Sequence, residues 1–452
     1  MISRRDFLTH SSAGLGGLAW STLMAQSSRG AIAAHGPAKS VIWLFMNGGP
    51  SHIDLFDPKP ELERWDGKLF PGDVDTLFPF PGPVMKSPFR FRQHGDSGAW
   101  VSELFPHLAR HVDDIAFIRS CTTEAKNHGA ALYNINTGSV LMGAPHVGAW
   151  ATYGLGTEND DLPGFIAMFD HRSCPETGVQ LWGSGFLPGQ YGGVTLRPAD
   201  PPVLYSRRPD RYSPAGQAVQ IDLVRQLNDR HAQRLPNCEE LHQRSRALER
   251  AFRMQVSIPE LTNIQQEDAA SRRLYGIDDP PCRYFGTQLL MARRMVERGV
   301  RFIQIYHGGA VRNWDQHSRL RQEHAALSYE TDRPIAGLLQ DLKQRGLLDS
   351  TLVVWGGEFG RTPTSQDFDG RDHNPHGFTM WMAGGGIRGG TAVGATDEFG
   401  CRAVERPVTV HDVHATILNR LGIDAEQLSF RFGGRDQTLT NGLGKTIGEV
   451  LS

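Results

Sequence analysis

One stretch of the sequence, residues 351–390, constrains the fold more than any other. It holds two short apolar runs, at residues 351–355 and 378–383, separated by a polar segment rich in glycines, carboxylates and histidines. Continuous apolar runs bounded by glycines are typical of strands in a parallel sheet that is covered on both faces. Ligands of such sheets bind beyond the carboxyl ends of the strands, so the polar segment is a candidate site.

The polar segment carries Glu358, Arg361, Asp372, His373 and His376. Histidine nitrogen and carboxylate oxygen are the donors that zinc takes in proteins, whereas calcium prefers oxygen alone. The close spacing of Asp372, His373 and His376 favours a metal or acid–base site, and the alternative is an ordinary solvated loop. The Arg361 guanidinium suits either a two-pronged contact with an anionic oxygen or an ion pair with a neighbouring carboxylate.

The pattern of an apolar run followed by polar residues occurs at three other places. Candidate ligands or catalytic groups follow each run: Asn47, Ser51, His52 and Asp54 after residues 41–46, Thr122, Thr123 and His128 after residues 115–118, and Asp315 and His317 after residues 301–306. In a parallel sheet all of these groups share one rim, so we expect them to lie together. Mixed histidine and carboxylate donors favour an ion such as zinc or manganese. Two ions about 4 Å apart would allow displacement at phosphorus or sulfur.

Other polar groups have structural explanations. His52 and Asp54 also suit a turn or a cap. His411 and His414 fall near the start of a predicted helix at residues 410–421, which Asp412 could cap. The glycine-rich residues 384–390 lack the Lys-Ser/Thr ending of a phosphate-binding loop and predict a flexible turn.

Helices alternating with strands predict an α/β fold with a mostly parallel sheet. Residues 218–274 are charged and amphipathic, which indicates a helical insertion or lid at about residues 200–280. The net charge of −2 leaves no basic surface for nucleic acid, so no nucleic-acid partner is expected. Five widely spaced cysteines without a C-x-x-C pair exclude a cysteine zinc ribbon.

The N-terminus predicts export. Residues 3–8, S-R-R-D-F-L, resemble the twin-arginine signal, and they precede a weakly apolar stretch and an Ala-Ile-Ala cleavage pattern at residues 31–33. We therefore expect a signal peptide at residues 1–33, a folded domain at residues 39–452, and a periplasmic or extracellular location. No later apolar run approaches 18 residues, so no membrane span is predicted after signal removal.

Several longer motifs together resemble the exported bacterial family called domain of unknown function 1501. They are GPSHIDLFDPKP at residues 49–60, NWD at 313–315, EFGR at 358–361, GRDHN at 370–374 and HATIL at 414–418. That family is similar to sulfatases and belongs with the alkaline phosphatase superfamily. The resemblance covers nearly all of residues 39–452. It implies a three-layer sandwich with a central, mostly parallel sheet and metal ligands at the strand ends.

The resemblance also implies metal ligands. Asn47 stands where the first strand of the superfamily usually ends in a metal-binding Asp, with Asp54 further on. Asp315, His317 and Glu358 are similar to the later ligand pairs. The last histidine ligand looks like His373, with Asp372 and His376 as neighbouring candidates. The implied cofactor is a divalent metal, with zinc, calcium and manganese all open.

The resemblance also implies positions for the catalytic group. The sulfatase motif C/S-x-P-x-R is absent, because Cys121 is followed by Thr-Thr-Glu, and no formylglycine is expected there. Thr137 and Gly138 match the ending of the helix that follows the nucleophile. Counting back from them places His128 near the nucleophile position, with Thr122 or Thr123 as competitors. Arg361 would stabilise the anionic group.

The sequence thus predicts an exported, metal-dependent hydrolase of sulfate or phosphate esters, with a small-molecule or polysaccharide substrate. The alternative is a sulfatase-like protein that binds anionic glycans or a partner without turnover. That alternative rests on the neutral Asn47 and the missing sulfatase motif. The oligomeric state is left open.

Overall fold

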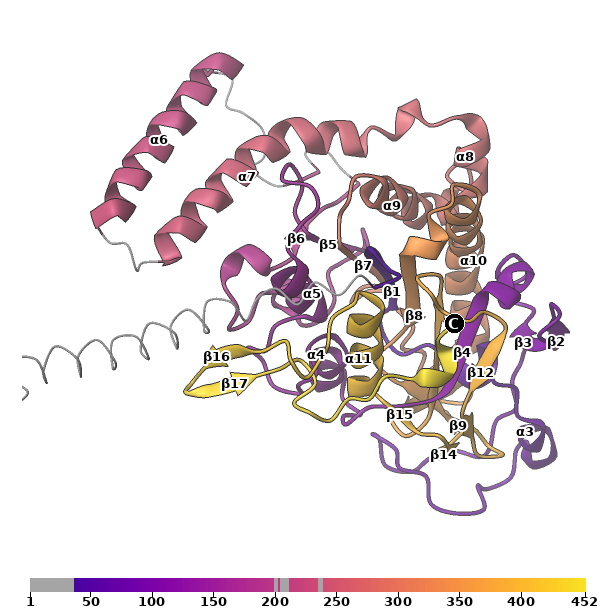
Figure 1. Cartoon of the computed structure of the whole chain (residues 1–452). Helices are drawn as coiled ribbons and strands as arrows, with labels where there is room; N and C mark the ends of the chain where they lie inside the picture. The colour runs from indigo at the N-terminus through magenta and orange to yellow at the C-terminus, as the bar shows by residue number, and fades with distance from the viewer. Residues whose placement is uncertain (1–35, 199–201, 204–210, 235–238) are drawn as a thin grey trace, which may run out of the picture.

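The computed structural model describes residues 36–198, 202–203, 211–234 and 239–452 (Figure 1). The predicted signal peptide lies outside these residues. Among the helices that are described, none combines the length and the apolar composition needed to cross a bilayer.

A nine-stranded sheet lies at the centre of the fold, in the order β12-β4-β11-β8-β1-β7-β5-β6, with β15 also paired to β4. All strands run in one direction except β11, which is antiparallel to both of its neighbours. The bounds are β1 Ser40–Met46, β4 Ile115–Thr122, β5 Phe165–Phe169, β6 Val194–Thr195, β7 Phe302–His307, β8 Thr351–Gly356, β11 Phe378–Ala383, β12 Thr391–Val393 and β15 Val408–Thr409.

Helices cover both faces of this sheet because the central strands are apolar on both sides. On β1, Ile42 and Leu44 join a core shared with α9 (Pro280–Glu297) and α10 (Leu320–Gln344). The alternate residues Val41, Trp43 and Phe45 join a second core. The second core is shared with α4 (His128–Thr137), α5 (Val147–Leu155) and α11 (Val410–Arg420). The predicted α/β sandwich with a mostly parallel sheet is therefore confirmed (Figure 1).

The segment between β8 and β11 differs from the expected polar loop between parallel strands. It forms a hairpin of β9 (Gly360–Gln366) and β10 (Gly370–Asn374). Because β11 is antiparallel to β8, it starts at the edge of the sheet where β8 ends. A parallel neighbour would need a crossover connection to reach the opposite edge. The whole segment consequently stays at the carboxyl rim.

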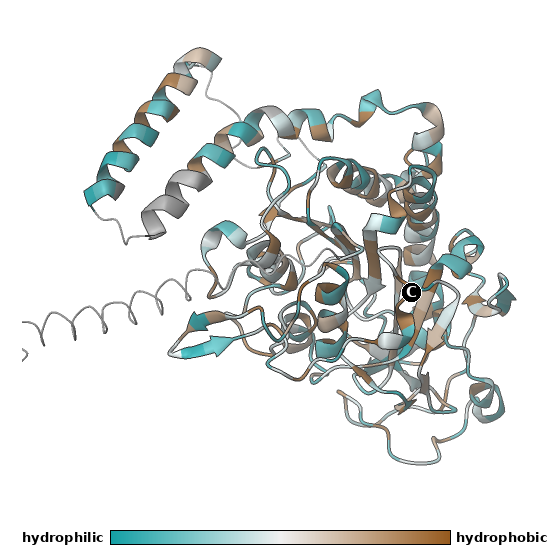
Figure 2. Ribbon diagram, in the orientation of Figure 1, coloured by the Kyte–Doolittle hydropathy of each residue, from teal (hydrophilic) through white to brown (hydrophobic). Residues whose placement is uncertain are grey.

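A helical segment that follows β6 extends away from the central sheet (Figure 1). It comprises α6 (Pro214–Arg234), α7 (Glu239–Thr262) and the short α8 (Ala269–Leu274). Figure 2 shows that α6 is largely hydrophilic, whereas the sheet is hydrophobic. The end of α7 is anchored, because Met254, Ile258 and Leu261 are buried in the first core.

The start of α11 has the structural role expected from its sequence. Thr409 caps the helix, and its side chain accepts the backbone N–H of Asp412, whose carboxylate accepts the N–H of Thr409 in return. The buried His414 ring lies 2.8 Å from the carbonyl oxygen of Ile135, to which Nε2–H donates. This bond joins α11 to α4.

His414 makes the stability of the fold dependent on pH. Burial lowers its pKa from 6.5 to about 3, so the ring stays neutral in the folded protein but takes up a proton below pH 6.5 when unfolded. The contribution of the neutral His414 ring to the free energy of unfolding is complete above pH 6.5. It is lost as the pH falls below 6.5, because the unfolded chain then binds a proton that the folded protein does not. Between pH 6.5 and pH 5 we expect the parent protein to lose about 2 kcal/mol more unfolding free energy than His414→Asn. Urea unfolding at both pH values measures this, and equal losses would contradict it.

Candidate metal centre

Four side chains from distant parts of the chain converge at the carboxyl rim. His128 is the first residue of α4, which begins with Asn127 as its side-chain cap. Asp315 and His317 lie in the loop between β7 and α10, and His373 lies on β10. The strands bring these elements together because the loops after β4, β7 and β8 leave the sheet at the same edge.

The Asp315 carboxylate is the centre of this group. Its Oδ1 lies 2.8 Å from Nε2 of His317 and 3.0 Å from Nε2 of His373. Its Oδ2 lies 3.2 Å from Nε2 of His128. The Nε2 atoms of His317 and His373 are themselves only 3.1 Å apart. We call Asp315, His317 and His373 the His-Asp-His triad.

The hydrogen bonds of the two triad rings fix their tautomers. His373 Nδ1 lies 2.7 Å from the Lys126 carbonyl oxygen, which can only accept, so Nδ1 carries the proton. His317 Nδ1 contacts the amide oxygen of Gln366 in the same way. In the neutral rings both Nε2 lone pairs therefore face Asp315 Oδ1. Ligand atoms of tetrahedral zinc, bound at about 2.05 Å, lie about 3.3 Å apart, close to the separations in the triad.

The electrostatics of the group follow from burial and from its neighbours. Burial alone would raise the pKa of Asp315, but Arg361 and the surrounding histidines hold it far below its usual range. Burial lowers the pKa of His373 to about 4, although the neighbouring Asp315 carboxylate opposes this shift. Burial opposes the charged form of His128 too, but Asp315 and Glu358 raise its pKa to about 9.

At the same rim of the sheet, two buried oxygen atoms have no hydrogen-bond partner among the residues that the structure describes. Glu358 is fully buried; its Oε1 accepts the N–H of Gly48 at 2.8 Å and lies 2.8 Å from Nδ1 of His128, whereas Oε2 has no hydrogen-bond partner. Asn47 Oδ1 is also unpartnered. The two residues follow neighbouring strands, because Phe45 of β1 is paired with Gly356 of β8. Buried carboxylate oxygens without donors are costly, so this position suits a cation.

Arg361 holds Asp315 in place. Its Nη2 donates to Asp315 Oδ1 at 2.6 Å, and its Nε donates to the carbonyl of Gly49 at 2.8 Å. The remaining donors reach the backbone carbonyls of Gly48, Trp314 and Arg371. The side chain is 1% exposed. The structure thus directs the guanidinium to the protein interior, and its carboxylate partner is Asp315.

Asp372 is next to the triad but is occupied by backbone donors. Its Oδ2 accepts the N–H of Phe78 at 2.9 Å and its Oδ1 accepts the N–H of His373 at 2.7 Å. With His317 and His373 it forms a second group whose ligand atoms lie close enough to hold an ion.

Asp54, an expected ligand, belongs to a buried ion pair instead. Its Oδ2 lies 2.7 Å from Nε of Arg371 and 2.5 Å from Oγ of Ser51, and its Oδ1 lies 3.2 Å from Nη2 of Arg371. Both charged side chains are fully buried. Burial alone would raise the pKa of Asp54, but Arg371 lowers it below its ordinary value. The expectation was wrong because a fully buried arginine on β10 takes both carboxylate oxygens.

His376, Thr122 and Thr123 also have partners away from the triad. His376 pairs with Asp75 at 2.9 Å, and its side chain is 43% exposed. The Thr122 hydroxyl donates to the Val408 carbonyl at 3.4 Å. The Thr123 hydroxyl donates to Oδ1 of Asn134 at 2.9 Å. The structure therefore brings together His128, Asp315, His317 and His373, but not these three residues.

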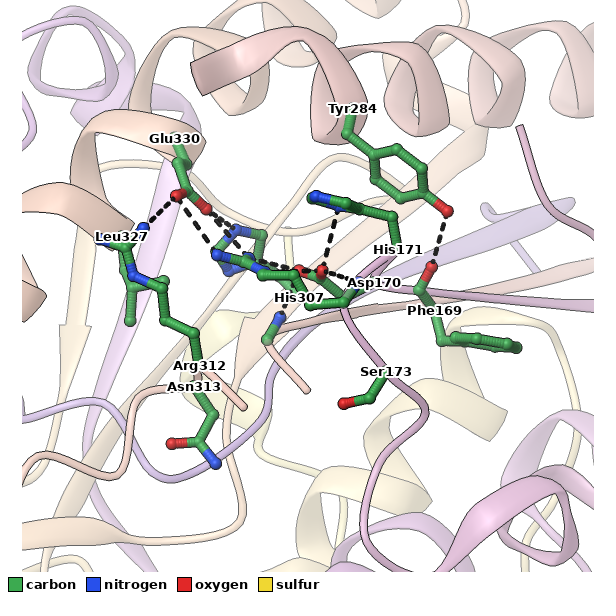
Figure 3. A network of polar contacts seen from close by, with 12 residues as sticks. Phe169, Asp170, His171, Ser173, Tyr284, His307, Arg312, Asn313, Leu327 and Glu330 are labelled. Atoms are coloured by element: carbon green, nitrogen blue, oxygen red, sulfur yellow. Dashed lines mark hydrogen bonds and ion pairs between the residues drawn. The ribbon is translucent and has the colours of Figure 1, made fainter. Parts of the chain in front are cut away.

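A second polar network, which the sequence analysis missed, lies at the ends of β5 and β7 (Figure 3). Trp314 Nε1 donates to Nδ1 of His307 at 3.1 Å, so His307 Nε2 donates to Glu330 at 3.1 Å. Arg172 bridges Glu330 and Asp170. Asp170 follows β5 directly, so the strand-end rule could have found it. The network supports the loop that carries Asp315, because Trp314 belongs to that loop.

Comparison with known proteins gives a family. The family described as "Protein of unknown function (DUF1501)" matches residues 38–451. No curated protein matches the sequence.

Solved structures give only distant likenesses. They include the phosphonate monoester hydrolase SpPMH from Silicibacter pomeroyi, with 11% identity, a TM-score of 0.38 and coverage of 90% of this chain and 76% of that chain. PsFucS1 sulfatase from Pseudoalteromonas sp. has 12% identity, a TM-score of 0.37 and coverage of 97% and 77%. Alkaline phosphatase from the Antarctic bacterium TAB5 has 9% identity, a TM-score of 0.34 and coverage of 86% and 99%. Because the identities and TM-scores are so low, these proteins assign no chemistry to this chain.

The buried pair of Asp54 and Arg371 gives a direct test of the corrected role of Asp54. Asp54→Asn leaves an uncompensated buried guanidinium, which should lower the unfolding free energy by about 3–5 kcal/mol. Divalent metal content per folded molecule should not change. Glu61→Gln, which removes an exposed pair with Arg64, serves as the control and should cost less than about 1 kcal/mol. Loss of metal from a folded Asp54→Asn protein would restore Asp54 as a ligand.

Proposed function

We propose that this chain, which belongs to the DUF1501 family, binds a divalent cation at the His-Asp-His triad and hydrolyses a sulfate or phosphate ester there. The observation that carries the proposal is the convergence of two Nε2 lone pairs on Asp315 Oδ1 within 3.1 Å. Three electron-pair donors at such distances repel one another unless a cation or a proton lies between them. Two nitrogens and one oxygen are a donor set that zinc accepts while keeping a coordination position open.

The unpartnered oxygens of Asn47 and Glu358 extend the donor set. They are buried and lie after neighbouring strands, so they fit a second cation that prefers oxygen. A bound divalent cation would polarise the ester and stabilise negative charge on its oxygens. In this proposal the protein residues hold the cation and orient the reacting groups, and the cation supplies the charge stabilisation.

The protein residues have separate proposed tasks. Arg361 positions Asp315, because its donors are fixed between that carboxylate and backbone carbonyls. Glu358 orients His128 by accepting from Nδ1, and Nε2 faces Oδ2 of Asp315 at 3.2 Å. Because the two carboxylates raise the pKa of His128 to about 9, the Nε2 atom can react only after it has given up its proton. We therefore assign His128 as the nucleophile or as the group that positions it.

A second candidate function is binding of an anionic glycan without turnover. It is favoured by the hydroxyls of Thr122 and Thr123, which are bonded elsewhere, so neither offers a nucleophile at the triad. The two functions share the cation and differ in hydrolysis.

We further propose that the chain is exported by the twin-arginine route, on the strength of the S-R-R-D-F-L sequence at residues 3–8. Replacing Arg4 and Arg5 together by Lys keeps the charge but removes the arginine pair. Fractionation of cells should then find the uncleaved precursor retained inside, whereas the parent protein is found as the shorter mature form outside the cytoplasm. Unchanged export of the double variant would contradict the proposal.

Removal of a triad ligand tests the metal and the reaction together. His373→Ala and Asp315→Asn should abolish stoichiometric zinc or manganese, measured by elemental analysis of the mature protein. Hydrolysis of the 4-nitrophenyl esters of sulfate and phosphate should fall by roughly a hundredfold or more, because the proposed cation stabilises the reacting anion. His376→Ala, which removes a histidine outside the triad, is the matched control and should retain both.

The outcomes separate the two candidate functions. A parent protein with stoichiometric metal and slow hydrolysis that His373→Ala abolishes supports the hydrolase. A metal-loaded parent that hydrolyses neither ester supports the binding protein. A parent without metal and without turnover contradicts both.

A further inference from the structure

A hollow of about 710 Å³ opens directly beside the His-Asp-His triad. His317 and Asp372 form part of its lining, so it adjoins the proposed reaction centre. One wall is residues 76–83 and the other is the tip of the β9–β10 hairpin, residues 364–368. A ligand whose ester reached the triad would place its adjoining group in this space.

Two aromatic residues on these walls are exposed to an unusual degree. Phe80 is 95% exposed and Phe368 is 99% exposed. Both have positive φ angles, 65° and 74°, in the left-handed region that favours glycine. An exposed apolar ring on a strained backbone contributes little to folding. Strain of this kind is concentrated at ligand clamps and active sites, so it motivates a binding role.

The two walls are tied to each other by backbone pairing. The N–H of Gly82 donates to the Ser365 carbonyl at 3.0 Å, and the N–H of Ser365 donates to the Pro83 carbonyl at 2.8 Å. Val84 and Thr364 form an antiparallel bridge. The two rings therefore project from segments that backbone hydrogen bonds hold together, which limits the entropy lost when a ligand is bound.

The segment of residues 76–83 is also connected to the triad. The backbone N–H of Phe78 donates to Asp372, and the Phe78 ring meets the His317 ring edge-on, with centroids 5.2 Å apart. The inner end of the hollow is thus in contact with a proposed metal ligand.

The chemistry of the lining distinguishes between kinds of ligand. Besides the phenyl rings, the lining includes the polar side chains of Thr76, Gln366 and Asp367, whereas Thr364 and Ser365 are buried. A sugar ring has apolar C–H faces that suit phenyl rings and hydroxyls that suit amide, hydroxyl and carboxylate groups. A simple aryl group would use the phenyl rings but not the polar side chains.

We propose that this hollow binds a sugar ring of a polysaccharide, with Phe80 and Phe368 contacting the faces of the ring and the polar side chains bonding its hydroxyls. The ester carried by that ring would then reach the triad. The placement of the ester at the triad rests on the proposed function, but the contact between the hollow and the sugar ring needs no metal.

Affinity electrophoresis of the mature full-length protein tests the proposal. Native gels would contain galactan, fucan, xylan or glucan, each unsulfated and sulfated, with a chelator present throughout. We expect at least one polysaccharide to retard the parent protein. The double variant Phe80→Ala/Phe368→Ala should bind that polysaccharide about tenfold more weakly, from the loss of two ring contacts. Phe432→Ala, at a 52% exposed phenylalanine outside the hollow, is the control and should bind as the parent does.

A second double variant guards against misfolding. Phe80→Gly/Phe368→Gly removes the rings and also relieves the positive φ angles, so it should fold at least as well as the parent and still bind about tenfold more weakly. Retardation by none of the polysaccharides, or equal retardation of the parent and the glycine variant, would overturn the proposal. So would a parent dimer that the glycine variant converts to monomer in sedimentation, because the rings would then bind a second copy of the chain. Since the chelator removes any metal, failure of ester hydrolysis does not affect this result.

Discussion

The bond between Arg361 and Asp315 is the interaction on which the candidate site depends. The guanidinium joins three segments that are far apart in sequence: the turn after β1, the loop after β7 and the β9–β10 hairpin. The turn can approach it only because residues 48 and 49 are glycines. Their φ angles are 109° and 74°, and a Cβ on Gly49 would lie 2.6 Å from the Phe359 ring. A glycine turn, a buried arginine and one carboxylate thus form a single unit.

This unit explains why three histidines gather around one carboxylate. Asp315 is held by Arg361 on one side, so its oxygens are fixed before any ligand arrives. His317 and His373 are in turn oriented through their Nδ1 atoms by Gln366 and by the Lys126 carbonyl. Such preorganisation is what a metal site requires, because outer hydrogen bonds set the orientation of each donor. The hollow with Phe80 and Phe368 adds a place for the rest of a substrate.

The sequence predicted the rim of the sheet well and the individual partners less well. Asp315, His317, Glu358 and His373 were identified because parallel strands place their following residues at one edge, which is a property of the fold. Asp54 follows the same rule, yet its partner Arg371 lies 317 positions away, and no local pattern reveals such a pair. The direction of β11 was equally hidden, since an apolar run looks the same in a parallel and an antiparallel strand. Phe80 and Phe368 carried no signal, because exposure and positive φ are properties of the folded chain.

The central claim is that a divalent cation lies between His317, His373 and Asp315. Anomalous diffraction from crystals of the mature protein, grown with zinc and recorded on both sides of the zinc edge, tests this most directly. We predict a peak bounded by the two Nε2 atoms and Asp315 Oδ1, each at about 2.0–2.2 Å. Absence of any peak there, with the two Nε2 atoms and the carboxylate in direct contact at full zinc concentration, would contradict it.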